Sequence, residues 1–289
     1  MNAKMPSRAS PDALAYCADS VRVADSDRFA TLAFAPAERR PGLLALYAFN
    51  VEVAKSREMV SQQLIGSIRL QWWRDAITEI YEGTPRRHQV VEPLAEAVHR
   101  FDLDKDTFDA LLEAREADMA DDPPADLDAL TAYARDTAGG LVRLALQVLG
   151  ARDAPAMAAG EAVGTAWGLV GLIRAVPFHA RMRRCAMPAD LLAEAGLTAH
   201  DVVERGGSSA LSGVVRRVAE AAEARLAAGR VLRRQVPRRA LPALLCGALA
   251  SGHLTQLRRA GWNPFDPRVA SPLPSRAWRL LAASVSGRY

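Results

Sequence analysis

The sequence contains only three cysteines, Cys17, Cys185 and Cys246, and no two of them form a Cys-x-x-Cys pair. An odd and scattered set supports neither a disulfide framework nor a zinc site, so we expect a reducing compartment. The N-terminal segment lacks the apolar core of a signal peptide. No uncharged run approaches the ~20 residues that span a bilayer. We therefore expect a cytoplasmic protein that is at most peripheral to the inner membrane.

Signals for β-strands are also scarce, because β-branched runs are short and few segments alternate apolar with polar residues. Helical periodicity recurs instead, and 50% of the 289 residues are hydrophobic, which is ample for a buried core. These patterns predict an all-α protein. We expect residues 1–10 to be a disordered leader and residues 11–289 to form one domain.

The charge balance is mildly basic, with a formal net charge of +4 and a sequence pI near 9.2. We expect the basic charge to be spread over the chain rather than concentrated, and nearly all of the basic residues are arginine. This balance permits an acidic partner or contact with an anionic membrane surface, but it falls short of the footprint of a nucleic-acid-binding protein. We expect no nucleic-acid partner.

The most informative stretch is residues 169–188, LVGLIRAVPFHARMRRCAMP. Its periodicity predicts a helix that Pro177 kinks or ends, because proline has no N–H and its ring displaces a carbonyl. From Gly171 onward the stretch resembles the second signature segment of the squalene/phytoene synthase family, N-I-L-R-D-V-x-E-D-x-x-x-G-R-x-Y-L-P. Ala175, Phe178 and His179 stand where that family has its three acids.

A second match begins at Tyr47, where YAFNVEV resembles the family segment Y-A-F-C-R-x-V. The family continues with D-D-x-x-D, whose acids hold diphosphate through magnesium. In this sequence those positions are Ala54, Lys55 and Glu58, so one carboxylate remains. The acids are therefore replaced in both segments.

Further segments follow the family in order, so the resemblance spans roughly residues 25–285. IRLQWWRDA, which contains Arg74, resembles L-x-W-W-R-x-A-L, and GWNPF at 261–265 resembles the closing turn. Gly139 and Gly140 lie inside a helix predicted over 133–150, which implies close packing or a wall that faces a ligand. The resemblance implies a helical bundle around a central cavity, the isoprenoid-synthase fold. We expect these residues to bind substrate or partner: Tyr47, Asn50, Arg74, Gly139, Gly140, Arg174, Arg181 and Arg184.

The missing acids bear on chemistry, because ionising an allylic diphosphate requires magnesium held by carboxylates and phosphate oxygens. Arginines can hold a diphosphate but do not replace that activation. The string R-A-x-P-x-H at 174–179 is similar to one in the mitochondrial complex I assembly factor of squalene/phytoene synthase-like type.

We therefore expect a protein without a cofactor that binds respiratory complex subunits and has lost catalysis. Two alternatives stay open. One is an active head-to-head prenyl diphosphate synthase with an atypical Mg²⁺ site. The other is an isoprenoid carrier or sensor that holds an apolar prenyl ligand in its cavity.

Overall fold

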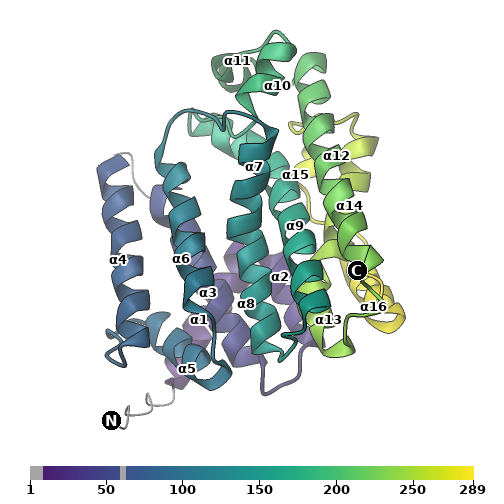
Figure 1. The fold of residues 1–289 in the computed structure, drawn as a ribbon. Helices are drawn as coiled ribbons and strands as arrows, with labels where there is room; N and C mark the ends of the chain where they lie inside the picture. The colour runs from purple at the N-terminus through teal and green to yellow at the C-terminus, as the bar shows by residue number, and fades with distance from the viewer. Residues whose placement is uncertain (1–8, 59–62) are drawn as a thin grey trace.

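The computed structural model describes residues 9–58 and 63–289, together with all of their side chains except those of residues 57, 58 and 63. These described residues form helices and turns without a strand, as the sequence predicted (Figure 1). The N-terminal half contains α1 (Pro11–Ala24), α2 (Ser26–Thr31), the 3₁₀ helix η1 (Leu32–Phe34), α3 (Arg40–Glu58), α4 (Gln63–Tyr81), α5 (Val91–Phe101), α6 (Lys105–Ala114), the 3₁₀ helix η2 (Arg115–Met119), α7 (Leu127–Ala134), the π-helical turn η3 (Arg135–Gly139) and α8 (Gly140–Val148).

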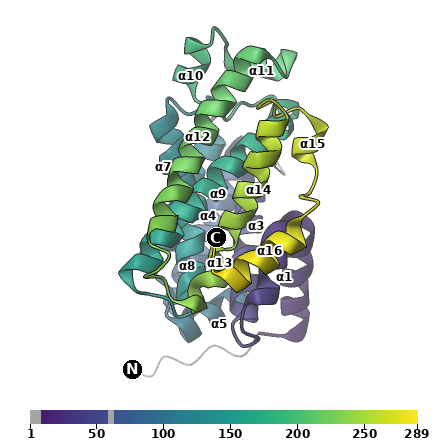
Figure 2. The ribbon, with the colours of Figure 1, turned by 90° about the vertical axis from the view of Figure 1, so that its right-hand side faces the viewer.

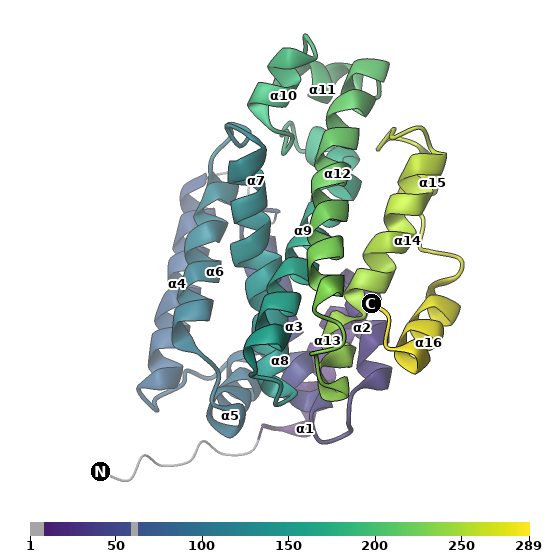
Figure 3. The ribbon, with the colours of Figure 1, turned by 45° about the vertical axis from the view of Figure 1, so that its right-hand side comes forward.

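The C-terminal half contains a long central helix followed by shorter ones. Its elements are α9 (Ala154–Arg181), α10 (Ala189–Glu194), α11 (Ala199–Arg205), α12 (Ser209–Val231), the 3₁₀ helix η4 (Arg238–Ala240), α13 (Leu241–Leu244), α14 (Cys246–Arg259), α15 (Pro267–Ala270) and α16 (Arg276–Ser286). Helix α9 packs against α7, α8, α12 and α14, and it lies in the middle of the bundle (Figure 3).

Polar residues at helix ends fix where several helices begin. The Ser10 hydroxyl accepts a hydrogen bond from the backbone N–H of Ala13, and Asp153 caps α9 in the same way. Thr198 and Asp201 form a reciprocal capping box at the start of α11. Ser10 is therefore the cap of α1, and residues 1–8 of the predicted leader lie outside the described residues.

Helix α9 continues through Pro177 to Arg181, so of the two expected effects, a kink or an end of the helix, the end does not occur at Pro177. The missing N–H of Pro177 removes one bond, the one to the carbonyl four residues earlier. The turn that follows Pro177 is still closed, because the N–H groups of Met182 and Arg184 reach the carbonyls of Phe178 and His179. The proline therefore lies one turn before the helix end.

Two helical stretches, Ala154–Arg181 and Arg238–Arg259, are long and apolar enough to cross a membrane by length and composition alone. Both lie mostly inside the bundle, as the core helices of a soluble protein do. Their apolar character is explained by packing against the surrounding helices.

Candidate functional site

A cavity of about 820 Å³ lies between α3, η2, α7, η3 and α9. Its walls are largely apolar and include Leu130, Trp167, Leu172 and Phe178. The residues around Arg181 and the segment 120–124 also line it, at the end of the bundle where α9 finishes. This size and lining are typical of sites for small ligands.

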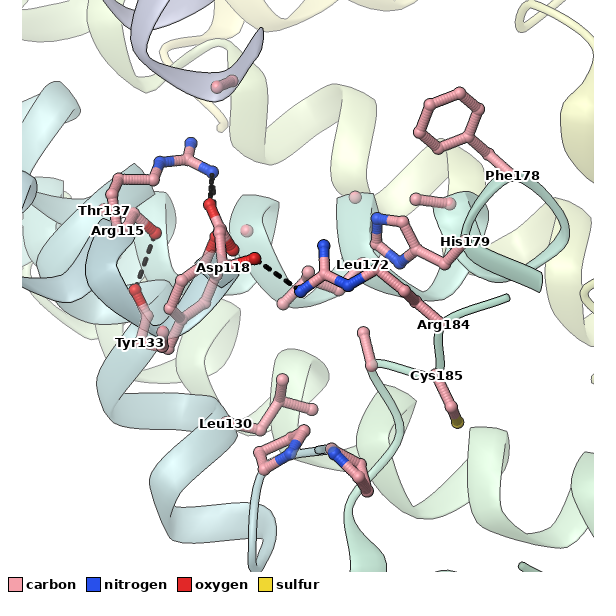
Figure 4. A pocket seen from close by; sticks show the side chains of 18 of the residues that line it. Arg115, Asp118, Leu130, Tyr133, Thr137, Leu172, Phe178, His179, Arg184 and Cys185 are labelled. Atoms are coloured by element: carbon pink, nitrogen blue, oxygen red, sulfur yellow. Dashed lines mark hydrogen bonds and ion pairs between the residues drawn. The ribbon is translucent and has the colours of Figure 1, made fainter. Parts of the chain in front are cut away.

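The polar part of the cavity is a network centred on Asp118. The Arg115 guanidinium donates to Asp118 Oδ2 at 3.1 Å and to the Tyr133 hydroxyl at 2.8 Å. That hydroxyl donates in turn to Asp118 Oδ1 at 2.7 Å, so both carboxylate oxygens are engaged. The Thr137 hydroxyl donates to the Tyr133 carbonyl at 2.6 Å, which fixes the same helical segment (Figure 4).

Burial and the Asp118 charge set the protonation of this network. Burial would lower the pKa of Arg115, but Tyr133 and the Asp118 carboxylate raise it above its ordinary value. Burial raises the pKa of the Tyr133 phenol, and the Asp118 charge adds to that effect against the opposing charge of Arg115. At neutral pH the network therefore contains a guanidinium and a neutral phenol next to the Asp118 side chain.

Arg184 and His179 lie next to this network (Figure 4). One terminal nitrogen of Arg184 donates to the carbonyls of Asp118 at 2.7 Å and Ala120 at 2.9 Å, which ties the end of α9 to the segment after η2. His179 Nδ1 is buried and has no hydrogen-bond partner within the described part of the chain. Burial and the nearby Arg184 charge lower the pKa of His179, so we expect a neutral imidazole at pH 7.

Six positions of this chain align with acids in the two family signature segments, and the structure brings four of them together. Ala54 on α3 and Ala175, Phe178 and His179 on α9 all line the cavity. The fifth, Lys55, is absent from the lining, and its ammonium lies 3.7 Å from a Glu52 carboxylate oxygen. The sixth, Glu58, has a side chain outside the described residues.

The expected binding residues divide into two groups. Asn50, Arg181 and Arg184 line the cavity. Arg74 instead pairs with Glu116 at 2.5 Å and links α4 to η2. Arg174 is absent from the lining, and its guanidinium lies 3.8 Å from the Asp27 carboxylate on α2.

Tyr47 is buried and does not line the cavity. Burial raises the pKa of its phenol, which the nearby Arg28 charge opposes. Tyr47 therefore contributes to the core behind the cavity.

Gly139 and Gly140 lie in different surroundings. A Cβ on Gly139 would lie 3.3 Å from the Glu161 carbonyl oxygen and from the Thr165 hydroxyl of α9, so this glycine allows close helix packing. Gly140 lines a separate polar pocket of about 140 Å³. Close packing, one of the two roles expected for the pair, therefore applies to Gly139.

The lining residues that sequence reasoning missed include Arg28, Arg115, Tyr133 and Trp167. Arg28 is buried, pairs with Asp25 at 2.5 Å and lies over the Trp167 ring, 5.7 Å from its centroid. The available signal was the spacing of each arginine three residues from an acid, as in Asp25–Arg28 and Arg115–Asp118. Such pairs are common on exposed helices, so the spacing alone did not indicate a cavity.

The acidic donors of the cavity are few. Asp118 and Asp122 line it, and Asp118 is already held by Arg115 and Tyr133. In the part of the chain that the structure describes, no three His, Cys, Asp or Glu side chains are grouped so that they could hold a metal ion. The described lining combines an apolar wall with arginine side chains.

Comparisons with known proteins agree with this architecture. The family model described as "Squalene/phytoene synthase" matches residues 21–279. The chain is 31% identical over 259 residues to "NADH dehydrogenase (ubiquinone) complex I, assembly factor 6" of Mus musculus, covering 90% of this chain and 78% of that protein. It is 27% identical over 221 residues to "Presqualene diphosphate synthase" of Rhodopseudomonas palustris, covering 75% and 78% of the two chains.

Among solved structures, a dehydrosqualene synthase in complex with ligand superposes with a TM-score of 0.82 at 18% identity, covering 96% of each chain. This likeness confirms the predicted fold, an all-α isoprenoid-synthase bundle. The matched segments, the bundle and the family model all lead to one assignment: this chain belongs to the squalene/phytoene synthase family.

Proposed function

We propose that this chain is a non-catalytic assembly factor for the respiratory NADH dehydrogenase, built on the squalene/phytoene synthase fold. The observation that carries the proposal is the identity of the side chains that line the cavity at the positions aligned with acids in the two family signature segments. Ala54, Ala175 and Phe178 offer no metal ligand there, and His179 is a half-buried imidazole whose pKa is lowered. The similarity to complex I assembly factor 6 over 90% of this chain supports the same conclusion.

The chemistry of the lining argues against prenyl transfer. Leaving-group ionisation needs magnesium, which prefers oxygen ligands in near-octahedral geometry. Of the described acids that line the cavity, Asp118 has both oxygens engaged by Arg115 and Tyr133, and only Asp122 remains. These donors do not fit a magnesium cluster, so we propose that the protein works without a cofactor.

The cavity lining suits ligand binding without that chemistry. The apolar wall formed by residues such as Leu130 and Leu172 suits a prenyl chain or an apolar segment of a partner. Arg181, which is exposed at the end of α9, suits an acidic group on that ligand. We propose respiratory complex subunits as the protein partner and the cytoplasmic side of the inner membrane as the location.

Two measurements test the assembly role. Deletion of the gene should lower NADH:quinone oxidoreductase activity and the amount of assembled complex, and the wild-type chain should restore both. The purified protein should not release diphosphate from farnesyl diphosphate with magnesium. Enzyme-like turnover by the unmodified protein, or normal complex assembly after deletion, would contradict the proposal.

An active prenyl diphosphate synthase is the second candidate, because the similarity to presqualene diphosphate synthase covers 75% of this chain. This candidate uses Mg²⁺ and predicts turnover by the unmodified protein. A variant with Asp at Ala54, Lys55, Ala175 and His179 provides the matched comparison. Turnover only in that variant supports a binding protein that descends from an enzyme, and turnover in neither variant leaves the enzyme candidate without support.

A third candidate is an isoprenoid carrier or sensor, and the apolar wall of the cavity favours it. It predicts tight binding of a prenyl ligand without turnover and normal complex assembly after deletion. Titration with farnesol and farnesyl diphosphate in the absence of metal, alongside the deletion strain, distinguishes it from the assembly factor.

A further inference from the structure

Helix α16 exposes apolar side chains on its outward face. Leu280 and Ala283 are buried, and the helix packs on α14 through that side. Trp278, Leu281 and Val285 are 75%, 47% and 70% exposed. Their spacing of three and four residues places them on one face of a helix. An ordinary surface helix has polar residues on the side away from the core, whereas this apolar stripe is left exposed by the part of the chain that the structure describes.

The chain around α16 is strongly basic. Residues 224–289 contain twelve arginines, no lysine, no glutamate and a single acid, Asp266. The remaining residues contain more acids than bases, so the basic charge is concentrated rather than spread along the chain as expected. A basic surface next to exposed apolar side chains is typical of a membrane-binding face.

The fold places part of this basic segment beside the end of α16. Arg230 Nε donates to the Tyr289 main-chain oxygen at 2.6 Å, and a terminal nitrogen of Arg238 approaches the Ser284 carbonyl at 3.4 Å. Val231, at the end of α12, is 79% exposed there. In Figure 2, α16 lies on the near side of the molecule with no other element over it.

Several of these arginines carry uncompensated charge. Among the described residues, no carboxylate forms an ion pair with Arg233 and Arg234 in the loop after α12, with Arg238 at the start of η4, or with Arg288 beyond α16. Two neighbours are neutralised, because Arg239 pairs with Asp153 at 3.7 Å and Arg276 pairs with Asp27 at 3.3 Å. The face therefore combines an apolar stripe with a net positive rim.

We infer that this face, defined by Trp278, Leu281 and Val285 with Arg233, Arg234 and Arg238, binds the surface of an anionic phospholipid membrane. The three apolar side chains would enter the boundary between headgroups and acyl chains, where the amphipathic indole of tryptophan is favoured. The arginines would contact lipid phosphates, which guanidinium groups match well. The face is the outward side of a surface helix, and the cavity of about 820 Å³ is lined by other elements.

The experiment is flotation of the purified full-length chain with vesicles of phosphatidylcholine alone or mixed with phosphatidylglycerol. We expect binding only to the anionic vesicles, and weaker binding as salt is added. The variant Trp278→Ser/Leu281→Ser should bind about tenfold more weakly or worse, because two buried apolar side chains are lost from the interface. Arg233→Gln/Arg234→Gln should weaken binding and reduce its salt dependence.

The matched control is Leu64→Ser/Ile68→Ser on α4, where two aliphatic side chains are 69% and 59% exposed. This variant should bind vesicles like the wild type. Brominated lipids should quench the fluorescence of bound wild-type protein, and Trp278→Phe should remove most of that quenching while binding persists. Circular dichroism checks that all variants are folded.

Four outcomes would overturn the inference. These are no binding to anionic vesicles, equal binding to neutral vesicles, equal loss of binding in the α4 control, and a lipid-free dimer that Trp278→Ser dissociates. The last outcome would identify a second copy of the chain as the occupant. Since only protein and lipid are used, the result does not depend on the proposed assembly role.

Discussion

Nε2 of His253 lies 3.0 Å from a carboxylate oxygen of Asp27, and this contact joins α14 to α2 across 226 residues of sequence. Both side chains are buried, and Arg174 and Arg276 approach the same carboxylate at 3.8 Å and 3.3 Å. Burial lowers the pKa of His253, and the Arg174 charge lowers it further against the opposing effect of Asp27. The neutral imidazole therefore donates its Nε2–H to Asp27.

The first prediction concerns pH. A histidine whose pKa is lowered on folding binds its proton more readily in the unfolded chain, so the folded state loses stability as pH falls below the ordinary value of 6.5. One such group contributes a slope of at most ~1.4 kcal/mol per pH unit. His253→Gln keeps a donor but does not titrate, so it should reduce the slope of unfolding free energy between pH 7 and pH 5.

Urea unfolding at several pH values measures that slope. His99→Gln, on the exposed surface of α5, is the control and should leave the slope unchanged. His88 and His179 also have lowered pKa values, mainly through burial, so part of the slope should remain in His253→Gln. An identical slope in both variants would show that His253 is not the group responsible.

The second prediction concerns Asp27 itself. Asp27→Ala removes the only acid that pairs with His253 and Arg174 among the described residues, and it leaves the Arg174 charge partly buried without a partner. Removing one partner of a buried pair costs roughly 3–5 kcal/mol, and the partial exposure of Arg174 places the expected loss at ~3 kcal/mol.

Asp19→Ala is the matched control for Asp27, because Asp19 pairs with Arg22 on the surface of α1. Exposed pairs contribute about 0–1 kcal/mol, so this variant should unfold near the wild-type midpoint. Guanidinium unfolding monitored by circular dichroism gives both values. Comparable losses in the two variants would contradict the structural role of Asp27.

The third prediction concerns the contact between α9 and η3. A Cβ on Gly164 would lie 2.7 Å from the Ala138 carbonyl oxygen and 2.7 Å from the Gly139 Cα, and both are backbone atoms that cannot move independently. Gly164→Ala should therefore destabilise the fold by ~1–3 kcal/mol. Gly213 is at an exposed position of α12, where an added Cβ meets no atom within 4 Å, so Gly213→Ala should be stabilising by up to ~1 kcal/mol. Thermal unfolding distinguishes the two, and equal effects would contradict the close approach.

The fold could be predicted from the sequence largely because local signals and the long matched segments agree. Ser10 and Pro11 mark the start of α1, and Gly196, with φ of 68°, follows the end of α10. The π-helical turn η3 could not be predicted, because its extra residue per turn is set by packing of Gly139 on α9 rather than by composition.

The site could be predicted only in part. Ala54, Ala175 and His179 line the cavity. Their place could be predicted, because the two signature segments indicate which sides of α3 and α9 face each other. Arg74 and Arg174 were expected at the site, but each reaches an acid on another element, Glu116 or Asp27. A long arginine side chain can extend in several directions from its helix, and the sequence alone does not predict which acid it will reach.

The fourth prediction concerns cysteine reactivity. Burial raises the pKa of Cys17 to about 12 and that of Cys246 to about 11, and both thiols are enclosed by the core. Cys185 is also buried, and its pKa is raised, but it lines the cavity. In the folded protein, a thiol reagent at pH 8 should modify Cys185 slowly and leave the other two intact. Mass spectrometry identifies the modified site, and Cys185→Ser should abolish the native reaction.

The fifth prediction concerns the cavity. Ala175 lines it from α9, so Ala175→Phe should fill part of the space next to Leu172 and Phe178. If the cavity holds an apolar chain without metal, farnesol should bind the wild type, and Ala175→Phe should weaken that binding by roughly tenfold through lost contact area. Ala228→Phe places the same side chain on the exposed side of α12 and should bind farnesol normally. Calorimetric titration provides the affinities, and a loss in both variants, or in neither, would mean that farnesol binds elsewhere.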